Sequence, residues 1–260
     1  MRWNTVSILV ILVMMSPALS SQSSPLAKDG RVRAAYLASN PAQAVKDPTT
    51  GQARGIVVDL ARELERLHGV TVSLIPLANP QAVIDAVRTG EADIGFVAYN
   101  PERAGTVEFS QPYLLVNQTF LVRADSSIRS IADIDRQGRK LGATRADSIA
   151  LYLGRTLTHG QLVQLDDSRP EAIYRMLREG AIDAFGANRQ RLTDMARDAA
   201  GFRLLPDDLY GVEQTIIVPG GRRDARDAAD RFIDDVRRSG FLKSSIEQSG
   251  VVGVAVAPGR

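Results

Sequence analysis

Residues 90–113 read GEADIGFVAYNPERAGTVEFSQPY, and this stretch decides the fold. Gly90 is typical of a helix end, and residues 93–98 are predicted to form a strand. Asn100 and Pro101 then resemble an N-cap and the first residue of a helix, so free backbone N–H groups are expected near Arg103. The end of one helix, a strand and the start of another helix follow in close succession, which indicates an α/β domain.

The same alternation extends to both sides of this stretch. We expect a first unit with strands at 32–37, 70–75 and 93–98, a helix from 57 that Gly69 ends, and a helix at 81–88. After Ser130 we expect helices at 131–137, 148–156, 170–179 and from 189 onward, with strands at 140–143, 162–165 and 183–186. Strands that alternate with helices favour two α/β units with mainly parallel strands.

Two β-rich stretches, 117–123 and 211–219, flank the second unit and suit extended crossings between the units. Helices at 224–238 and 242–249 would then return to the first unit. The expected lobes are 31–116 plus 219–260 and 117–218. Two crossings would form a hinge, with a ligand cleft between the lobes.

The first 20 residues are predicted to be a signal peptide. Arg2 supplies the positive charge, residues 6–15 are apolar, and small residues at Ala18 and Ser20 favour cleavage after Ser20. The apolar stretch is much shorter than the roughly 20 residues of a membrane-spanning helix. The alternative is an uncleaved anchor. Because the chain has no cysteine, a lipid anchor on a thiol is excluded, and we expect a freely diffusing periplasmic protein.

Composition excludes several other classes of protein and site. The absence of cysteine excludes disulfides and thiolate metal sites, and two histidines are too few for a histidine-based metal site. The chain has 32 basic and 30 acidic side chains, a balance that gives no reason to expect a nucleic acid or an anionic membrane as a partner. We expect no metal, no cofactor and a monomer.

Four stretches carry a resemblance to family 3 of the bacterial solute-binding proteins, the polar amino acid receptors of ABC importers. GIVVDLA at 55–61 resembles the family's opening of the first helix, and GAIDA at 180–184 and SGFL at 239–242 resemble later turns. The most specific match joins NPERA at 100–104 to EFSQPY at 108–113, similar to the family's Thr-x-x-Arg and Phe-Ser-x-Pro-Tyr motifs. The resemblance implies a two-lobed type II periplasmic-binding-protein fold with a two-strand hinge.

The resemblance also implies a function. Such a receptor would bind a small carboxylate-bearing ligand, an amino acid or a related organic acid, between its lobes and present it to an inner-membrane ABC permease. Arg103 matches the family arginine that grips the ligand's α-carboxylate, and a guanidinium offers a carboxylate two parallel donors. Asn100 stands where the family has threonine, and it either donates to a ligand oxygen or caps the turn.

Departures from the family pattern affect the ligand prediction. The family's covering aromatic residue has no counterpart after the first strand, where Asn40 is the candidate contact, and Tyr36 is expected to pack inside the strand. Asn188 stands where the family aspartate pairs with the ligand's ammonium. This exchange removes a charge-assisted contact and makes an ordinary amino acid a less secure ligand.

Further candidates lie in the second lobe and on the return crossing. Asp147, followed by Ser148, replaces the family's Gly-Thr pair, and Asp147 is either an N-cap or a replacement carboxylate. Arg145 would add a second cation for a dicarboxylate, and Gln214 a polar contact. Each of these last two has a structural or solvent-facing role as its alternative.

Two other functions remain open. A periplasmic enzyme similar to the cyclohexadienyl and arogenate dehydratases would need an acid in the cleft, such as Asp147 or Glu213. The sequence contains no nucleophile elbow and no cysteine, so we expect no catalytic residues. The second alternative is a ligand-sensing module, which would have to act on a separate partner.

Overall fold

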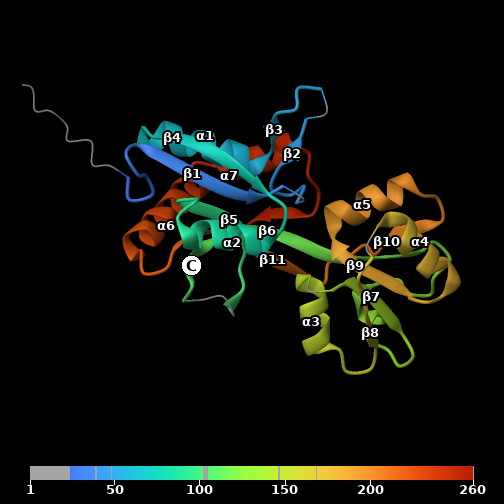
Figure 1. Ribbon diagram of the computed structural model, residues 1–260. Coiled ribbons are helices and arrows are strands. Elements are labelled where there is room, and N and C mark those ends of the chain that lie inside the picture. Colours follow the sequence, from blue (N-terminus) through green and yellow to red (C-terminus); the bar gives the residue numbers. More distant parts are fainter. Residues whose placement is uncertain are drawn as a thin grey trace, which may run out of the picture.

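The computed structural model describes residues 24–38, 40–47, 49–101, 105–145, 147–167 and 169–259. Within them the chain forms two α/β lobes that share one mixed sheet (Figure 1). The expected fold class is therefore confirmed. The predicted signal peptide, residues 1–20, lies outside the described residues.

The first lobe has a parallel three-stranded core with helices on both faces. Its elements are β1 (Arg31–Leu37), α1 (Ile56–His68), β4 (Thr71–Leu77), α2 (Pro80–Thr89), β5 (Ile94–Ala98), α6 (Arg223–Arg238) and α7 (Phe241–Ser249). The strand order is β4-β1-β5, and both pairings are parallel. Successive β1 residues face opposite sides, so Ala35 packs with α2 while Ala34 and Tyr36 pack with α1 and α6. Tyr36 is buried, as expected for a packing role.

The second lobe repeats this plan. Its elements are β7 (Lys140–Thr144), α3 (Ser148–Thr156), β8 (Gln161–Leu165), α4 (Pro170–Glu179), β9 (Ala184–Asn188) and α5 (Arg189–Asp198). The order β9-β7-β8 is again parallel. Apolar residues of α3 pack on one face of these strands, and those of α4 and α5 on the other. Both lobes therefore bury a sheet between helices, as the alternating sequence pattern predicted.

Two long strands, β6 (Val107–Arg123) and β11 (Tyr210–Pro219), connect the lobes. They pair antiparallel with each other, from Gln118 opposite Tyr210 to Val107 opposite Pro219. At its first-lobe side β11 also pairs with β5, and at its second-lobe side β6 also pairs with β9. The sheet thus runs without interruption through both lobes. The residue boundaries expected for the lobes and crossings stay a prediction.

Some elements differ from the sequence-based expectations. The helix expected at 131–137 is a single 3-10 turn, Ile131–Asp133, held by a capping box between Ser130 and Asp133. The loop expected before residue 54 contains a short hairpin, β2 (Val45–Lys46) with β3 (Ala53–Arg54). β10 (Phe202–Leu204) and β12 (Val254–Val256) pair with β6 and were not predicted. Strands of two or three residues are too short to show an alternating pattern.

The strand β6 is longer than the β-rich stretch that predicted it. Its first half contains Pro112, which cannot donate a ladder hydrogen bond. The pairing with β11 changes register on both sides of Thr215, which lies opposite Pro112. This irregularity lets the strand continue past the proline. None of the helices in the described part of the chain has the length and apolar character of a membrane span.

Candidate ligand-binding cleft

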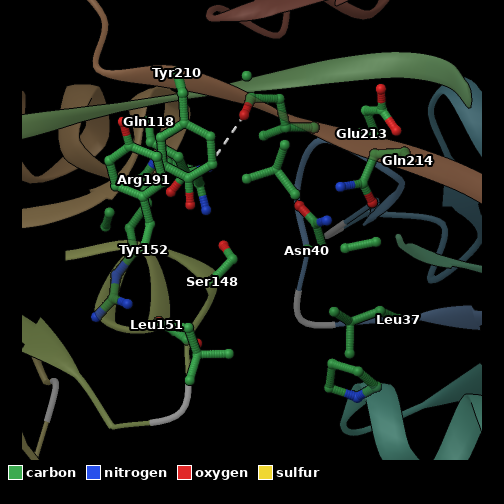
Figure 2. A pocket seen from close by; sticks show the side chains of 18 of the residues that line it. Leu37, Asn40, Gln118, Ser148, Leu151, Tyr152, Arg191, Tyr210, Glu213 and Gln214 are labelled. Atoms are coloured by element: carbon green, nitrogen blue, oxygen red, sulfur yellow. Dashed lines mark hydrogen bonds between the residues drawn. The ribbon is translucent and has the colours of Figure 1, made fainter. Parts of the chain in front are cut away.

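A cleft of about 910 Å³ opens between the two lobes. Figure 2 shows side chains of both lobes facing each other across it, with Arg191 and Tyr152 on one side and Leu37 and Asn40 on the other. The connecting strands contribute Gln118, Tyr210, Glu213 and Gln214. Sites for small molecules occupy roughly 300–1,000 Å³, so the space suits a small solute.

The strand ends of both lobes place polar residues at the cleft. Asn40 and Asn100 follow the carboxyl ends of β1 and β5 in the first lobe, and Asp147 and Asn188 mark those of β7 and β9 in the second. The carboxyl ends of parallel strands lie at one edge of a sheet, where open α/β sheets bind their ligands. The two lobes therefore direct equivalent edges toward one another.

In the first lobe, Asn100 lines the cleft, whereas Arg103 lies outside the described residues. The carboxylate contact of Arg103 stays a prediction. Asn40 also lines the cleft, and its Oδ1 accepts a hydrogen bond from the Ala42 N–H at 3.1 Å. This side chain therefore shapes the turn that follows β1 and still borders the ligand space.

Gln214 lies on β11 and is almost completely buried at the floor of the cleft. Its Oε1 accepts a hydrogen bond from Gln43 Nε2 at 3.2 Å. Gln43 in turn accepts from the Leu37 N–H at 3.0 Å, at the end of β1. Sequence reasoning missed Gln43, which fixes Gln214 against the first lobe. Nothing in its local sequence marked it, because the partner lies 171 residues away.

Asn188 caps helix α5. Its Oδ1 accepts a hydrogen bond from the Arg191 N–H at 2.9 Å. Asparagine is among the preferred N-cap residues because it satisfies one of the free donors of the first turn. The oxygen of Asn188 is therefore engaged by its own helix, and its NH₂ group is the part suited to the cleft.

Asp147 holds the N-cap position of helix α3, but its side chain makes no capping hydrogen bond. It lines the cleft instead. The carboxylate touches solvent, yet the surrounding walls remove enough water to raise its pKa. That desolvation outweighs the opposing influences of the Arg191 charge and the Thr144 hydroxyl. The capping role expected first from the sequence is thus not performed by this side chain.

Ser148 and two tyrosines border the same part of the cleft. Tyr152 of α3 and Tyr210 of β11 stack with ring centroids 4.3 Å apart and an interplanar angle of 13°. Burial raises the pKa of Tyr210 to about 12, and the nearby Ser148 hydroxyl partly opposes this rise. The contact with Ser148 falls short of a regular hydrogen bond, because Tyr210 Oη has none among the described residues.

Arg145 is not brought into the cleft. Its Nε donates to Asp166 Oδ1 at 2.6 Å on the exposed surface after β7. The structure places Asp147, Ser148 and Asn188 together in the second lobe and leaves Arg145 outside that group.

Arg191 is a cleft residue that sequence reasoning missed. It lies in the first turn of α5, and its guanidinium stacks over the Phe185 ring at 5.4 Å from the ring centroid. Burial lowers its pKa, and the negative charge of Asp147 opposes this shift. A cation in the first helical turn faces the positive end of the helix dipole. The absence of acidic residues from that turn was the signal that could have pointed to it.

The described part of the chain contains no group of three or more histidine or acidic side chains arranged to hold a metal ion. The polar groups that line the cleft are amides, hydroxyls, carboxylates and guanidinium groups from both lobes. Such groups recognise a small polar solute through hydrogen bonds and charge.

Comparison with known proteins agrees with this arrangement. A family model described as bacterial extracellular solute-binding proteins, family 3, matches residues 32–249. The glutamine-binding protein of Geobacillus stearothermophilus is 26% identical over 173 residues. The match covers 65% of this chain and 64% of that relative, slightly less than two thirds of its length.

Solved structures share the fold. An ancestral arginine-binding protein bound to glutamine superimposes with a TM-score of 0.66 at 20% identity, covering 86% of this chain and 99% of that one. The ancestral amino acid-binding protein AncCDT-1, described as a precursor of cyclohexadienyl dehydratase, gives a TM-score of 0.65 at 21% identity, covering 84% and 94%. At these identities the likeness shows the two-lobed type II periplasmic-binding-protein fold.

Proposed function

Because the chain belongs to the family 3 bacterial extracellular solute-binding proteins, we propose that it is the receptor of an ABC importer. It binds an amino acid or a related small carboxylate in the cleft and presents the closed, loaded form to a membrane permease. Solute binding follows from the family. The proposal adds to this the class of ligand and the permease partner.

The observation that carries the proposal is the cleft itself, with polar groups from both lobes. Asn40 and Asn100 face it from the first lobe, and Asp147, Asn188 and Arg191 from the second. A ligand that contacts both walls binds the closed arrangement better than the open one, so it shifts the population toward closure. This difference in affinity is sufficient for a transport receptor, and no covalent step is required.

A thermal-shift screen tests the binding function. The purified protein is heated with amino acids, dicarboxylates, aromatic acids and amines, and a ligand raises the melting temperature by mass action. We expect at least one carboxylate to do so, and X-ray scattering of the complex should show a more compact particle. A panel in which no compound raises the melting temperature would contradict the proposal.

The carboxylate contact is tested separately at Arg103, whose placement in the family motif motivates it. Arg103→Ala should weaken binding of the best ligand while the melting temperature of the free protein changes little. Calorimetry measures the affinity, and an unchanged dissociation constant would remove Arg103 from the site.

An enzyme on the same scaffold is the second candidate, because the acids Asp147 and Glu213 both line the cleft. Dehydration requires an acid that protonates a leaving hydroxyl. Incubation with prephenate or arogenate, followed by detection of an aromatic product, decides between the two candidates. Formation of an aromatic product from either compound would contradict the receptor function.

We place the mature protein in the periplasm, outside the cytoplasm as the family description implies. The sequence pattern at residues 1–20 supports this location. N-terminal sequencing of protein from a periplasmic extract should begin at Ser21. Recovery of the intact N-terminus in the membrane fraction would favour the uncleaved anchor.

A further inference from the structure

We propose that Asp147, Tyr152 and Tyr210 form a cation subsite in the second lobe, which binds an ammonium group of the ligand. The inference rests on the proposed function, because it assigns one part of the same cleft. It also bears on the ligand class, since the exchange of the family aspartate for Asn188 had left the amino group without a partner.

The residues that precede helices α3 and α5 use their side chains differently. The side-chain oxygen of Asn188 accepts a hydrogen bond from the Arg191 N–H in the first turn of α5. Asp147 holds the equivalent position before α3 and makes no capping hydrogen bond. The Asn188 oxygen is therefore engaged by its helix, while Asp147 lines the cleft without a capping bond.

Asp147 lies in a cleft wall with Arg191 as a neighbouring cation. The cleft walls desolvate its carboxylate, and the nearest opposing charge in the described residues is that of Arg191. The Arg191 guanidinium lies over the Phe185 ring, and its influence on Asp147 is coulombic rather than a side-chain hydrogen bond. A desolvated carboxylate is stabilised when a ligand brings a cation into contact with it.

The other acids of the second-lobe wall are less suited to this role. Asp194 accepts hydrogen bonds from Gln190 Nε2 at 3.0 Å and from the Arg197 guanidinium. Arg197 also forms an ion pair with Asp198 at 3.8 Å. Asp194 and Asp198 therefore share the Arg197 guanidinium within their own helix, and within the second-lobe wall Asp147 is the carboxylate we assign to a ligand cation.

An aromatic surface lies near Asp147 in the same wall of the cleft. Tyr152 and Tyr210 lie face to face and both line the cleft (Figure 2). The faces of tyrosine rings attract cations, by about 0.5–1 kcal/mol at exposed sites and more in desolvated ones. A carboxylate beside a stacked aromatic pair favours an ammonium over a neutral or anionic group. The pair also supplies the aromatic contact that the segment after β1 lacks.

Matched ligand pairs test the subsite on the unmodified protein. L-alanine and L-lactate, L-glutamate and 2-hydroxyglutarate, and L-phenylalanine and phenyllactate each differ only in an amino or a hydroxyl group. Calorimetry is applied to each member, and we expect the amino compound of the best-binding pair to bind about 10- to 100-fold more tightly, as a charge-assisted contact provides.

Asp147→Asn then assigns the preference to this residue. The variant should lose most of the discrimination between the amino and hydroxy members, measured as the ratio of their two dissociation constants. Asp166→Asn is the matched control, because Asp166 is an exposed second-lobe acid paired with Arg145 outside the cleft. The control should keep the full preference for the amino compound.

The possible outcomes separate the two proposals. Equal or tighter binding of hydroxy or dicarboxylic acids would overturn the cation subsite, point to Arg191 as an anion contact and leave the receptor function intact. A preference that survives in Asp147→Asn would also overturn it. Failure of every compound in both series to bind would contradict the subsite and the proposed function together.

Discussion

Tyr152 and Tyr210 stack with their ring centroids 4.3 Å apart, and this contact joins helix α3 to the strand by which the chain leaves the second lobe. Tyr210 opens β11, opposite Gln118 of β6. A ligand that touches the stacked rings therefore touches the helix of one lobe and the beginning of a connecting strand. The stack is one place where binding can be transmitted to the hinge.

Removal of one ring should destabilise the second lobe. Stacked aromatic pairs contribute about 0.5–1.5 kcal/mol beyond the area they bury. Tyr152→Ala is expected to lower the free energy of unfolding by about 1–2 kcal/mol, measured by urea denaturation. Tyr152→Phe is the control and should retain most of the stability, since the ring remains. Equal losses in both variants would show that the hydroxyl matters more than the stack.

Gly186 of β9 should be intolerant of a methyl group. A Cβ there would lie 2.6 Å from Ile149 Cδ1 and 2.9 Å from Phe120 Cε1, so these core side chains would have to shift. Gly186→Ala is expected to cost about 1–3 kcal/mol of stability, seen as a lower urea midpoint. Gly154→Ala in α3 is the control, because its Cβ would meet Leu162 Cδ2 at an ordinary 3.7 Å. That variant should be neutral or slightly stabilising.

Arg237 connects α6 to two other segments. Its guanidinium donates to the carbonyl oxygens of Pro112 at 2.9 Å and Ala257 at 3.0 Å, and it also bonds Gln111 and Asp234. Arg237→Met should therefore lower the free energy of unfolding by about 2–3 kcal/mol, measured by urea denaturation. Arg238→Met, at a neighbouring exposed arginine, should cost far less. Similar losses for both would contradict a specific role of Arg237.

Asp135 should make the stability of the fold depend on pH in the acidic range. Its carboxylate accepts hydrogen bonds from the N–H groups of Thr158, His159 and Gly160 and from the Thr158 hydroxyl, and these hold its pKa well below the usual range. A lowered pKa means that the unfolded chain binds more protons than the native protein near and below pH about 4, so this stability is present above that pH and is lost as the pH falls.

The Asp135→Asn variant checks this dependence. It should melt at a lower temperature than the parent at pH 7, and the difference should shrink as the pH is lowered from 5 to 2. Glu91→Gln, at an exposed carboxyl, is the control for the general effect of removing a charge. A melting-temperature difference that stays constant across this range would contradict the role of the Asp135 carboxylate.

Local sequence patterns were sufficient for most elements of the fold. Helices at 148–156 and 170–179 were predicted with the bounds that the structure has, because their apolar periodicity and flanking residues lie within the helix itself. The family motifs likewise indicated the fold before any contact was known. The elements that were missed, such as β10 and β12, form only by pairing with β6, far away in the sequence.

The sequence by itself determined the α/β alternation, the two units and the family, because these depend on patterns among neighbouring residues. Only the tertiary structure decided which polar residues meet. Asp147 was predicted as either an N-cap or a ligand contact, and in the folded chain it makes no capping hydrogen bond and lines the cleft, whereas Asn188 caps α5. The tertiary structure likewise decided which arginine reaches the cleft. Arg145 pairs with Asp166 outside the cleft, and Arg191 lines it. Side-chain direction and desolvation depend on contacts between segments far apart in sequence, and no local pattern records them.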